Sequence, residues 1–229
     1  CMLIENQEGL VLFDTGCHPN AMTERWNEEN RLRTPVTIGE HEGILAALKQ
    51  LGYGPDDVKY VVLSHLHEDH AGCLEFFRKA QVFVSDKELR ETMKLYALRG
   101  DMGGYIANDI QVWLEQGVNW NLIEDEQQEE ELLEGIRILN FGSGHTFGMM
   151  GLLVTLPESG NFILASDCIN TKENYGPPLR YPGLAYDTIG YRKTIERIRR
   201  LEKQYQAKVL FGHDIDQYRS LKFVPEYYA

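Results

Sequence analysis

The feature that most constrains this chain is a short apolar run that ends in a cluster of metal-binding side chains. Residues 58–63 are mostly β-branched or otherwise apolar, the pattern of a buried strand. The next nine residues, 64–72, place three histidines and two acidic residues within six consecutive positions. Imidazole and carboxylate groups suit borderline and hard divalent metal ions. We therefore expect a strand whose carboxyl end opens onto a metal site. A solvated polar loop is the alternative, and the concentration of histidine argues against it.

Composition and charge exclude several classes of partner. The 229 residues are enough for a sizeable core, and 43% hydrophobic with 25% charged residues is ordinary for a globular protein. Lysine and arginine number 23 against 35 acidic residues, so the formal net charge is −12 and nucleic acid is not an expected partner. Two acidic runs, 124–126 and 129–131, predict a solvated face or loop. No apolar run approaches the ~18 residues of a membrane span, so no membrane association is expected.

The cysteines and the lack of a linker bear on compartment and domain count. The four cysteines have wide, irregular spacing and no CxxC pair, which favours a reduced, cytoplasmic protein with buried thiols. No linker splits the chain, so we expect one domain over residues 1–229. Cys1 does not look like a native start, and upstream residues are expected to have been removed.

The order of the predicted elements is typical of α/β layers. Strands are predicted at 2–5, 10–13, 58–63, 81–85, 121–123, 136–141, 151–156, 161–165 and 209–211, and helices at 40–51, 87–98, 106–115 and 188–205. Residues 17–39 are irregular and polar, which predicts a flap that covers substrate. The glycine-rich break at 100–105 predicts a lid or a pocket wall.

Ligand residues recur where predicted strands end. Four strand ends deliver Asp14, the 65–70 cluster, Asp167 and His213, and a glycine-rich loop, 142–148, presents His145. Five of the seven histidines fall at these positions. Our hypothesis is a pair of ions bridged by the carboxylate of Asp167, with the other ligands divided into two sets: His65, His67 and His145 for one ion, and Asp69, His70 and His213 for the second. Such a site keeps a position for water, as catalytic centres do. Asp14 is either a turn residue or a supporting contact beside the metals.

The spacing of these residues resembles the metallo-β-lactamase superfamily, whose signature is HxHxDH followed by a distant His, Asp and His. The resemblance implies an αββα four-layer sandwich with a di-metal site at one edge. It also implies the ligand division given above and a supporting place for Asp14. Within the superfamily the chain resembles the N-acyl-homoserine lactonases that quench quorum sensing. Four segments carry this likeness: 64–72, 171–175, 211–215 and 223–227.

The resemblance implies a hydrolase that opens a lactone ring, most simply that of an N-acyl-homoserine lactone. A metal-bridging hydroxide is expected to attack the ester carbonyl. Asp69 is expected to pass a proton to the leaving alkoxide, and a role as ligand only is the alternative. The cofactors are two divalent ions, zinc first, with iron, cobalt or manganese as alternatives. The partner is a small lactone or ester, and a homodimer is compatible with the sequence.

Three positions depart from the lactonase pattern. Asn170 stands where those enzymes usually carry a tyrosine that contacts the substrate carbonyl; an amide can also donate a hydrogen bond there, or the residue belongs to a turn. Phe147 and Met149 replace Pro and His. Tyrosines at 175, 181 and 186 either line the pocket or are exposed.

These departures keep other functions open. One is hydrolysis of another ester, a thioester or a cyclic amide on the same site. Another class is a non-catalytic metal-binding module or a di-iron redox protein. The di-iron reading is disfavoured because His67 stands where such proteins tend to carry a carboxylate. A nuclease is disfavoured by the acidic charge.

Overall fold

The computed structural model describes residues 1–39 and 42–229. Contacts within the chain define two compact units. The first comprises Cys1–Val84 and Leu89–Leu122, and the second comprises Ser85–Glu88 and Ile123–Ala229. There are two five-stranded sheets among the described residues, with strand orders β1-β2-β3-β4-β5 and β10-β9-β8-β7-β6. The single domain expected from the sequence stays a prediction.

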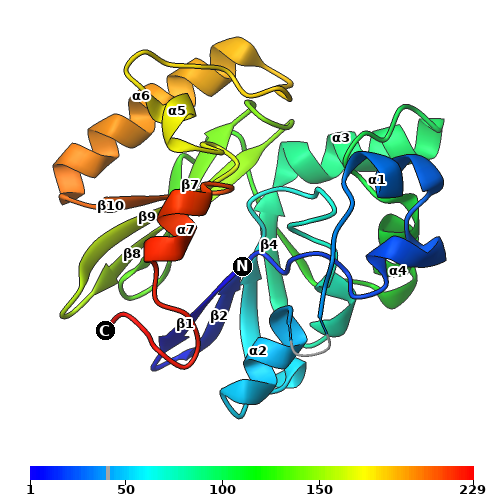
Figure 1. Ribbon diagram of the computed structural model, residues 1–229, viewed down its shortest axis with the longest axis horizontal. Coiled ribbons are helices and arrows are strands. Elements are labelled where there is room, and N and C mark those ends of the chain that lie inside the picture. Colours follow the sequence, from blue (N-terminus) through cyan, green and yellow to red (C-terminus); the bar gives the residue numbers. More distant parts are fainter. Residues whose placement is uncertain (40–41) are drawn as a thin grey trace. The chain divides into compact units, whose positions relative to one another are not determined.

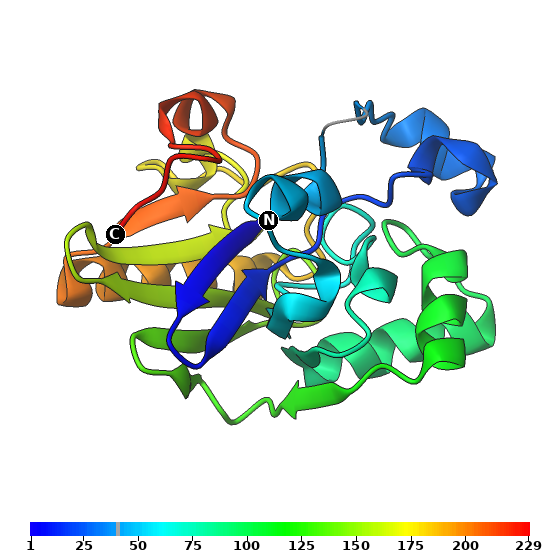
Figure 2. The same cartoon turned by 90° about the horizontal axis from the view of Figure 1, so that it is seen from below.

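The first sheet brings the strand ends that precede Asp14 and the 65–70 cluster to one edge. Its strands are β1 (Met2–Asn6), β2 (Gly9–Phe13), β3 (Val58–Val62), β4 (Gln81–Ser85) and β5 (Trp120–Ile123). The strands predicted at 2–5 and 10–13 form the antiparallel hairpin β1–β2, which Figure 2 shows in blue, whereas β2–β3 and β3–β4 are parallel. Because β2 and β3 run in the same direction, the residues that follow them lie next to each other. The Asp14 amide donates to the Val62 carbonyl at 2.9 Å, which ties the two ends together.

Helices of the first unit follow the predicted pattern with two additions. They are α1 (Glu28–Arg33), α2 (Ile44–Gln50), α3 (Asp86–Leu98, whose first turn belongs to the second unit) and α4 (Ala107–Gln116). Helix α2 is the helix predicted at 40–51, and residues 40 and 41 lie outside the described part. The segment 17–39 was predicted to be irregular, but it contains α1 and a short kinked turn, Ala21–Arg25, in which the backbone of Thr23 is not helical. Asn27 caps α1 by accepting from the Asn30 amide.

The second sheet is antiparallel except at one edge. It contains β6 (Glu129–Leu133), β7 (Ile136–Gly142), β8 (Met149–Leu156), β9 (Gly160–Ser166) and β10 (Lys208–Phe211). Neighbouring strands pair antiparallel from β6 to β9, whereas β9 and β10 pair in parallel. The parallel pair places the residues after β9 and β10 at the same edge. Asp167 and the segment 212–214 follow these two strands directly.

Helix α6 (Thr188–Tyr205) covers one face of this second sheet (Figure 1). Asp187 caps it by accepting from the amides of Ile189 and Gly190. Its apolar residues recur at helical spacing and pack against the sheet: Tyr191, Ile195, Ile198 and Leu201 contact a cluster that includes Leu139 and Ile163. Burial of each such side chain contributes roughly 2 kcal/mol. The short helices α5 (Lys172–Tyr175) and α7 (Ile215–Ser220) complete the unit.

Three elements of the second unit were not predicted: strand β6 and the short helices α5 and α7. The run 129–131 was predicted as a solvated face or loop, but it begins strand β6, with Glu129 and Glu131 exposed. Strand β6 lies at the edge of the sheet, beside β7. The side chains of Glu129 and Glu131 face solvent there, so glutamate is tolerated. Helix α7 begins after Asp214, whose side chain accepts from the Gln217 amide at 2.8 Å.

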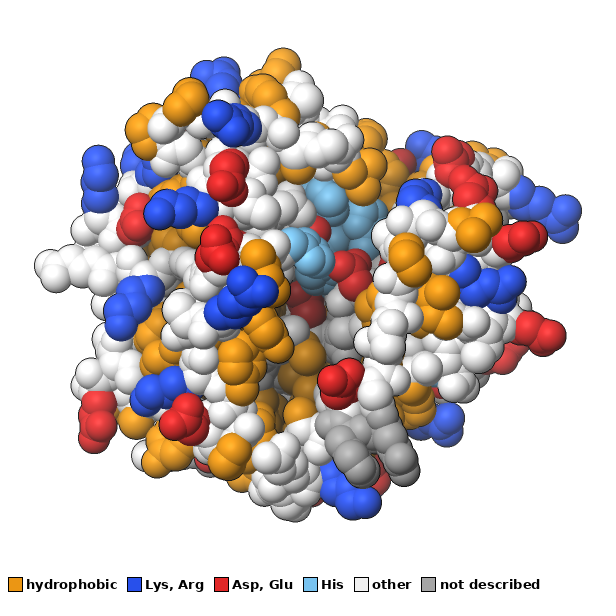
Figure 3. Space-filling view, in the orientation of Figure 1, with side chains coloured by type: hydrophobic (Ala, Val, Ile, Leu, Met, Phe, Trp, Pro, Cys, Tyr) orange, Lys and Arg blue, Asp and Glu red, His pale blue; other side chains and the backbone are white. Residues whose placement is uncertain are grey.

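Acidic and basic side chains are interspersed over the face in Figure 3 and do not form a broad basic field there. Within 1–39 and 42–229, no helix is both long enough and apolar enough to cross a membrane.

Candidate metal centre

The loop after β3 brings three imidazole rings together. His65, His67 and His70 are buried, and Asp69 is partly exposed. The ring centre of His65 lies 4.6 Å from that of His67 and 4.1 Å from that of His70. Each neutral imidazole has one nitrogen with a lone pair, so rings packed this closely place several potential metal-binding atoms in one small volume. This half of the predicted ligand set is therefore assembled within the first unit.

Asp14 supports this cluster from the end of β2. Its carboxylate accepts three hydrogen bonds: from the Ser64 amide at 2.7 Å, the Ser64 hydroxyl at 2.9 Å and His70 Nδ1 at 2.8 Å. Because the Ser64 proton goes to Asp14, the Ser64 oxygen accepts from His65 Nδ1, which lies 2.9 Å away. His65 and His70 thus carry their protons on Nδ1, and the lone pair of each ring is on Nε2, the atom that binds a metal.

The geometry of His70 fits a bound cation. Its Nε2 atom lies 3.4 Å from Asp69 Oδ2, while Nδ1 is held by Asp14. A neutral ring in this orientation turns a lone pair toward a carboxylate oxygen. Two acceptors that face each other are stabilised by a positive charge between them, either a proton or a metal ion. The donor set is therefore appropriate for a metal.

The second unit repeats this geometry around Asp167. His145 Nδ1 donates to the Leu184 carbonyl at 3.1 Å, so its Nε2 lone pair faces Asp167 Oδ2 at 3.4 Å. His213 Nε2 lies 3.0 Å from the other carboxylate oxygen, Oδ1. Asp167 is buried, whereas 48% of the His213 side chain is exposed. Each oxygen of this carboxylate therefore has an imidazole nitrogen within 3.4 Å.

Backbone requirements explain why these segments hold their shape. Ser166 has a φ of 47°, which turns the chain sharply after β9 and aims Asp167 away from the strand. Gly212 lies against this turn: a Cβ atom there would collide with Asp167 Oδ1 and with the backbone of Ser166. Glycine at position 212 is thus required for the close approach that precedes His213.

Three residues beside His67 were not predicted from the sequence. Glu68 is buried, accepts from the Thr34 hydroxyl at 3.0 Å and donates its amide to the Gly104 carbonyl at 2.9 Å. Burial raises the pKa of Glu68 to about 7. A Cβ on Gly104 would lie 2.7 Å from both Glu68 Oε2 and His67 Cδ2. The glycine-rich break at 100–105 gave a signal for this contact, but only the fold shows which residues it meets.

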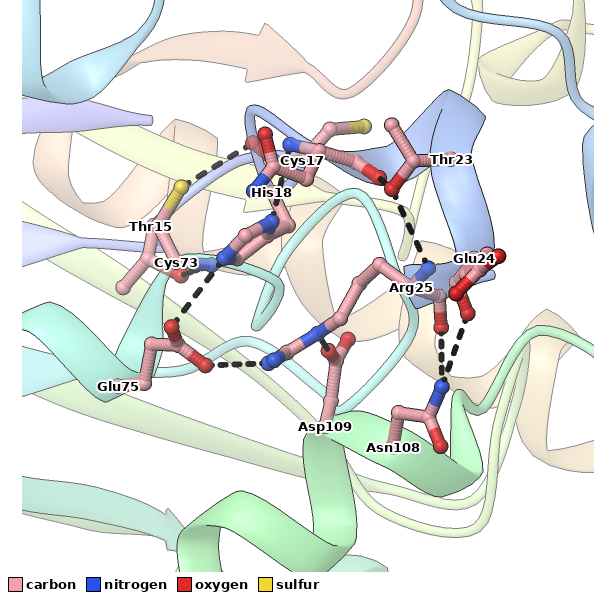
Figure 4. A network of polar contacts seen from close by, with 11 residues as sticks. Thr15, Cys17, His18, Thr23, Glu24, Arg25, Cys73, Glu75, Asn108 and Asp109 are labelled. Carbon is pink, nitrogen blue, oxygen red and sulfur yellow. Dashed lines mark hydrogen bonds and ion pairs between the residues drawn. The ribbon is translucent and has the colours of Figure 1, made fainter. Parts of the chain in front are cut away.

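A second polar cluster fixes the segment predicted as a flap (Figure 4). Arg25 donates to Asp109 at 2.5 Å and to Glu75, and Glu75 also lies 3.3 Å from His18 Nε2. Asp109 is buried in helix α4, and burial raises its pKa to about 7 even though Arg25 opposes this shift. Trp26, next to Arg25, is fully buried. The first part of the segment is thus anchored within the first unit.

The remaining predicted residues are placed as follows. The Asn170 side chain lies against Asp167, with Nδ2 donating to Oδ2 at 3.1 Å. The Tyr175 hydroxyl donates to Glu202 at 2.6 Å, so this tyrosine belongs to the packing of α6. Tyr186 is 58% exposed and its ring contacts that of Phe147. Tyr181 is 48% exposed.

Comparison with known proteins places this fold and donor set in one class. The profile of the metallo-β-lactamase superfamily matches residues 1–213, and the chain belongs to this superfamily. The chain is 42% identical to the N-acyl homoserine lactonase AiiB of Agrobacterium fabrum over 221 residues, which cover 96% of this chain and 80% of that protein.

Solved structures support the same assignment. An N-acyl homoserine lactone hydrolase with N-hexanoyl-L-homoserine bound at its catalytic metal centre matches 99% of this chain and 85% of its own, with a TM-score of 0.80 and 29% identity. A variant of Bacillus thuringiensis AiiA with N-decanoyl-L-homoserine at the active site has a TM-score of 0.81 at 29% identity over 99% and 85% of the two chains. The predicted fold and the predicted resemblance to the lactonases are confirmed.

Proposed function

We propose that this chain is a metal-dependent hydrolase that opens the ring of N-acyl-homoserine lactones. The observation that carries the proposal is the 42% identity with an N-acyl homoserine lactonase over 96% of the chain. The geometry of both units supports it, because imidazole Nε2 atoms face carboxylates at His70 and at His145. Imidazole and carboxylate donors of this kind suit a divalent metal ion.

The proposed ligands are those predicted from the sequence, and they would hold two divalent ions. His65, His67 and His145 would serve one ion, Asp69, His70 and His213 the other, and Asp167 would contribute to both. Five imidazoles and two carboxylates without a thiolate favour zinc, with iron, cobalt or manganese compatible with the same donors. When bound, such a pair of ions supplies Lewis acidity and water of lowered pKa at neutral pH.

The reaction adds one water across the ring ester. A bond forms between the water oxygen and the carbonyl carbon, the ring C–O bond breaks, and the leaving alkoxide takes a proton to give the open acyl-homoserine. Asp69 is the proposed carrier of that proton, because its carboxylate is partly exposed while the histidines around it are buried. Asp14 keeps the proton of His70 on Nδ1 throughout.

The proposed location is the cytoplasm. Cys1, Cys17, Cys73 and Cys168 are all free thiols, which supports a reducing, cytoplasmic environment.

A substrate panel tests the proposal. Purified protein with its metal should hydrolyse a short- and a long-chain acyl-homoserine lactone, measured as acid release at constant pH. Replacing Asp167 with alanine should abolish turnover and lower the metal content together. As a control, Asp56→Ala changes an exposed carboxylate paired with Lys79 and should retain both. Turnover of another ester or thioester without any turnover of homoserine lactones would refute the lactonase assignment.

A further inference from the structure

We propose that Asn170 is a positioning residue that sets the orientation of Asp167 and the place of His213. The inference rests on the proposed function, since it concerns two of the proposed metal ligands. All of the contacts involved lie within the second unit. In the turn after β9, the Asn170 side chain contacts Asp167 while its main chain contacts the segment that bears His213.

The side-chain contact fixes the carboxylate. Asn170 Nδ2 lies 3.1 Å from Asp167 Oδ2, the same oxygen that lies 3.4 Å from His145 Nε2. An ionised carboxylate only accepts hydrogen bonds, so the amide must present its nitrogen to Asp167; the opposite orientation would set two oxygens against each other. The donated bond occupies one lone pair of Oδ2 and restricts rotation of the carboxylate plane.

The orientation of the Asn170 side-chain amide leaves its oxygen unsatisfied, which supports this role. Asn170 Oδ1 is buried and has no hydrogen-bond partner within residues 1–39 and 42–229. Within a turn, an asparagine normally satisfies its oxygen with a nearby backbone amide. Here the oxygen is left unsatisfied and the nitrogen contacts the carboxylate, so the contact with Asp167 determines the rotamer.

The main chain of the same residue fixes the second ligand. The Asn170 carbonyl accepts from the His213 amide at 2.8 Å, and the preceding carbonyl, that of Ile169, accepts from the Gly212 amide at 2.9 Å. These two bonds hold the end of β10 against the turn after β9. The His213 side chain is 48% exposed and lies 3.0 Å from Asp167 Oδ1, so this backbone pair contributes to its position together with that contact.

The chemistry of an amide suits this position. A neutral N–H donor steadies a carboxylate without neutralising it, so Asp167 keeps its full charge for a cation. A lysine or arginine here would compete with the metal for the same oxygen. Supporting contacts of this kind typically change metal affinity about 10–100-fold when they are lost.

The test compares two variants that lose the donor. Asn170→Ala removes the amide, and Asn170→Leu keeps much of its volume without a donor. The control is Asn161→Ala, which removes another partly buried amide of the same unit, one that donates to the Tyr205 carbonyl. Zinc affinity is measured by competition with a chromophoric chelator, and the cobalt-substituted proteins are compared by visible absorption. Circular dichroism of the metal-free variants verifies folding, and if the leucine variant does not fold, the alanine variant carries the test.

The expected result is a zinc Kd raised about 10–100-fold in both Asn170 variants, with an altered cobalt spectrum and an unchanged control. At saturating zinc, kcat should fall while KM stays near that of the parent. Unchanged zinc affinity and an unchanged cobalt spectrum would overturn the proposal, as would a raised KM alone, which would indicate a substrate contact. The metal measurements need no substrate, so loss of the lactonase assignment would leave this test valid.

Discussion

Asp14 shows how a single carboxylate can organise a metal-binding loop. Its φ of 57° lies in the left-handed region, which turns the chain after β2 and brings the side chain under Ser64 and His70. Three donated hydrogen bonds restrain the carboxylate and, through it, the tautomers of two rings. Neither Ser64 nor Asp14 is itself a proposed ligand, yet both determine which nitrogen of each ring carries the lone pair.

Replacing Asp14 with asparagine should weaken metal binding. Asparagine tolerates the left-handed backbone, so the change isolates the carboxylate. An amide cannot accept from Ser64 and His70 as a carboxylate does, and zinc affinity should fall by about tenfold or more. Chelator competition measures the loss. Asp56→Asn, at an exposed ion pair, is the matched control, and equal affinity in the two variants would contradict the role of Asp14.

Gly104 gives a second prediction at the residue scale. An added Cβ would press on Glu68 and on the ring of His67, so Gly104→Ala should destabilise the fold by about 1–3 kcal/mol and reduce bound metal. Gly183→Ala is the control, because a Cβ there meets no atom within 4 Å. Urea unfolding and metal analysis of both variants decide the matter. Similar midpoints and metal content in the two would refute the packing argument.

The residues of the site could be predicted where candidate ligands are close together in the sequence or follow an apolar strand. The histidines of 65–70 are adjacent in the chain, and His145, Asp167 and His213 follow strands that the apolar pattern reveals. Glu68 and Thr34 were missed because their hydrogen bond joins segments 34 positions apart. The contact of Asn170 with Asp167 was also missed, since an asparagine three residues after an aspartate has many rotamers open to it.

At the level of secondary-structure elements, polar contacts hold the segment predicted as a flap, residues 17–39. Figure 4 shows Arg25 between Glu75 and Asp109, with Asn108 donating to the Glu24 and Arg25 carbonyls. The hydrogen bonds of Arg25 are costly to lose, because removal of its guanidinium would leave partly buried acceptors on Asp109 and Glu75 without that donor. The kinked turn at 21–25 is therefore fixed to α4.

Asp109 gives this cluster a pH dependence. Its folded pKa, about 7, lies above the ordinary value of 3.8, so the folded state binds the proton more tightly than the unfolded state. The associated stability is present at low pH and is lost as the pH rises through 7. Arg25, Glu75 and Glu68 are the charged groups that act on it.

Asp109→Asn should remove this dependence. Between pH 5 and pH 8 the parent should lose roughly 2 kcal/mol of unfolding free energy relative to the variant, as follows from about 1.4 kcal/mol per pKa unit. Urea unfolding at several pH values measures the difference. A parent and variant whose free energies run parallel across this range would contradict the assignment.

The sequence predicted the helices and strands that have continuous buried faces, and it missed the short or exposed ones. Strands β3, β8 and β9 and helix α6 have continuous apolar faces, and the sequence located them. Strand β6 was missed because three consecutive glutamates obscure the alternation of an edge strand. Helices α1 and α7 were missed because each spans six residues, too few for a helical period to stand out, and is defined chiefly by its cap.

At the scale of the whole molecule, metal binding should contribute to stability. The proposed ligands come from segments far apart in the sequence, and an unfolded chain does not present them together. Zinc at about 1,000 times its Kd would add about 4 kcal/mol, and each kcal/mol shifts Tm by about 2–4 °C in a chain of this size.

Removal of metal with a strong chelator should therefore lower Tm by roughly 10 °C, and added zinc should restore it. Differential scanning calorimetry measures both steps. The doubly substituted Asp167→Ala, His213→Ala protein serves as the control and should respond weakly to either treatment. A parent whose Tm is insensitive to chelator and zinc would show that the proposed ligands do not hold a metal in the native fold.

The central claim is that the seven proposed ligands hold two ions and that these support lactone hydrolysis. The most direct measurement is a zinc titration of the metal-free protein, with hydrolysis of N-hexanoyl-homoserine lactone followed at each point. We predict that activity rises from near zero and reaches its plateau at two ions per chain. Full activity at fewer than one ion per chain, or no hydrolysis of the lactone at any zinc level, would contradict the account.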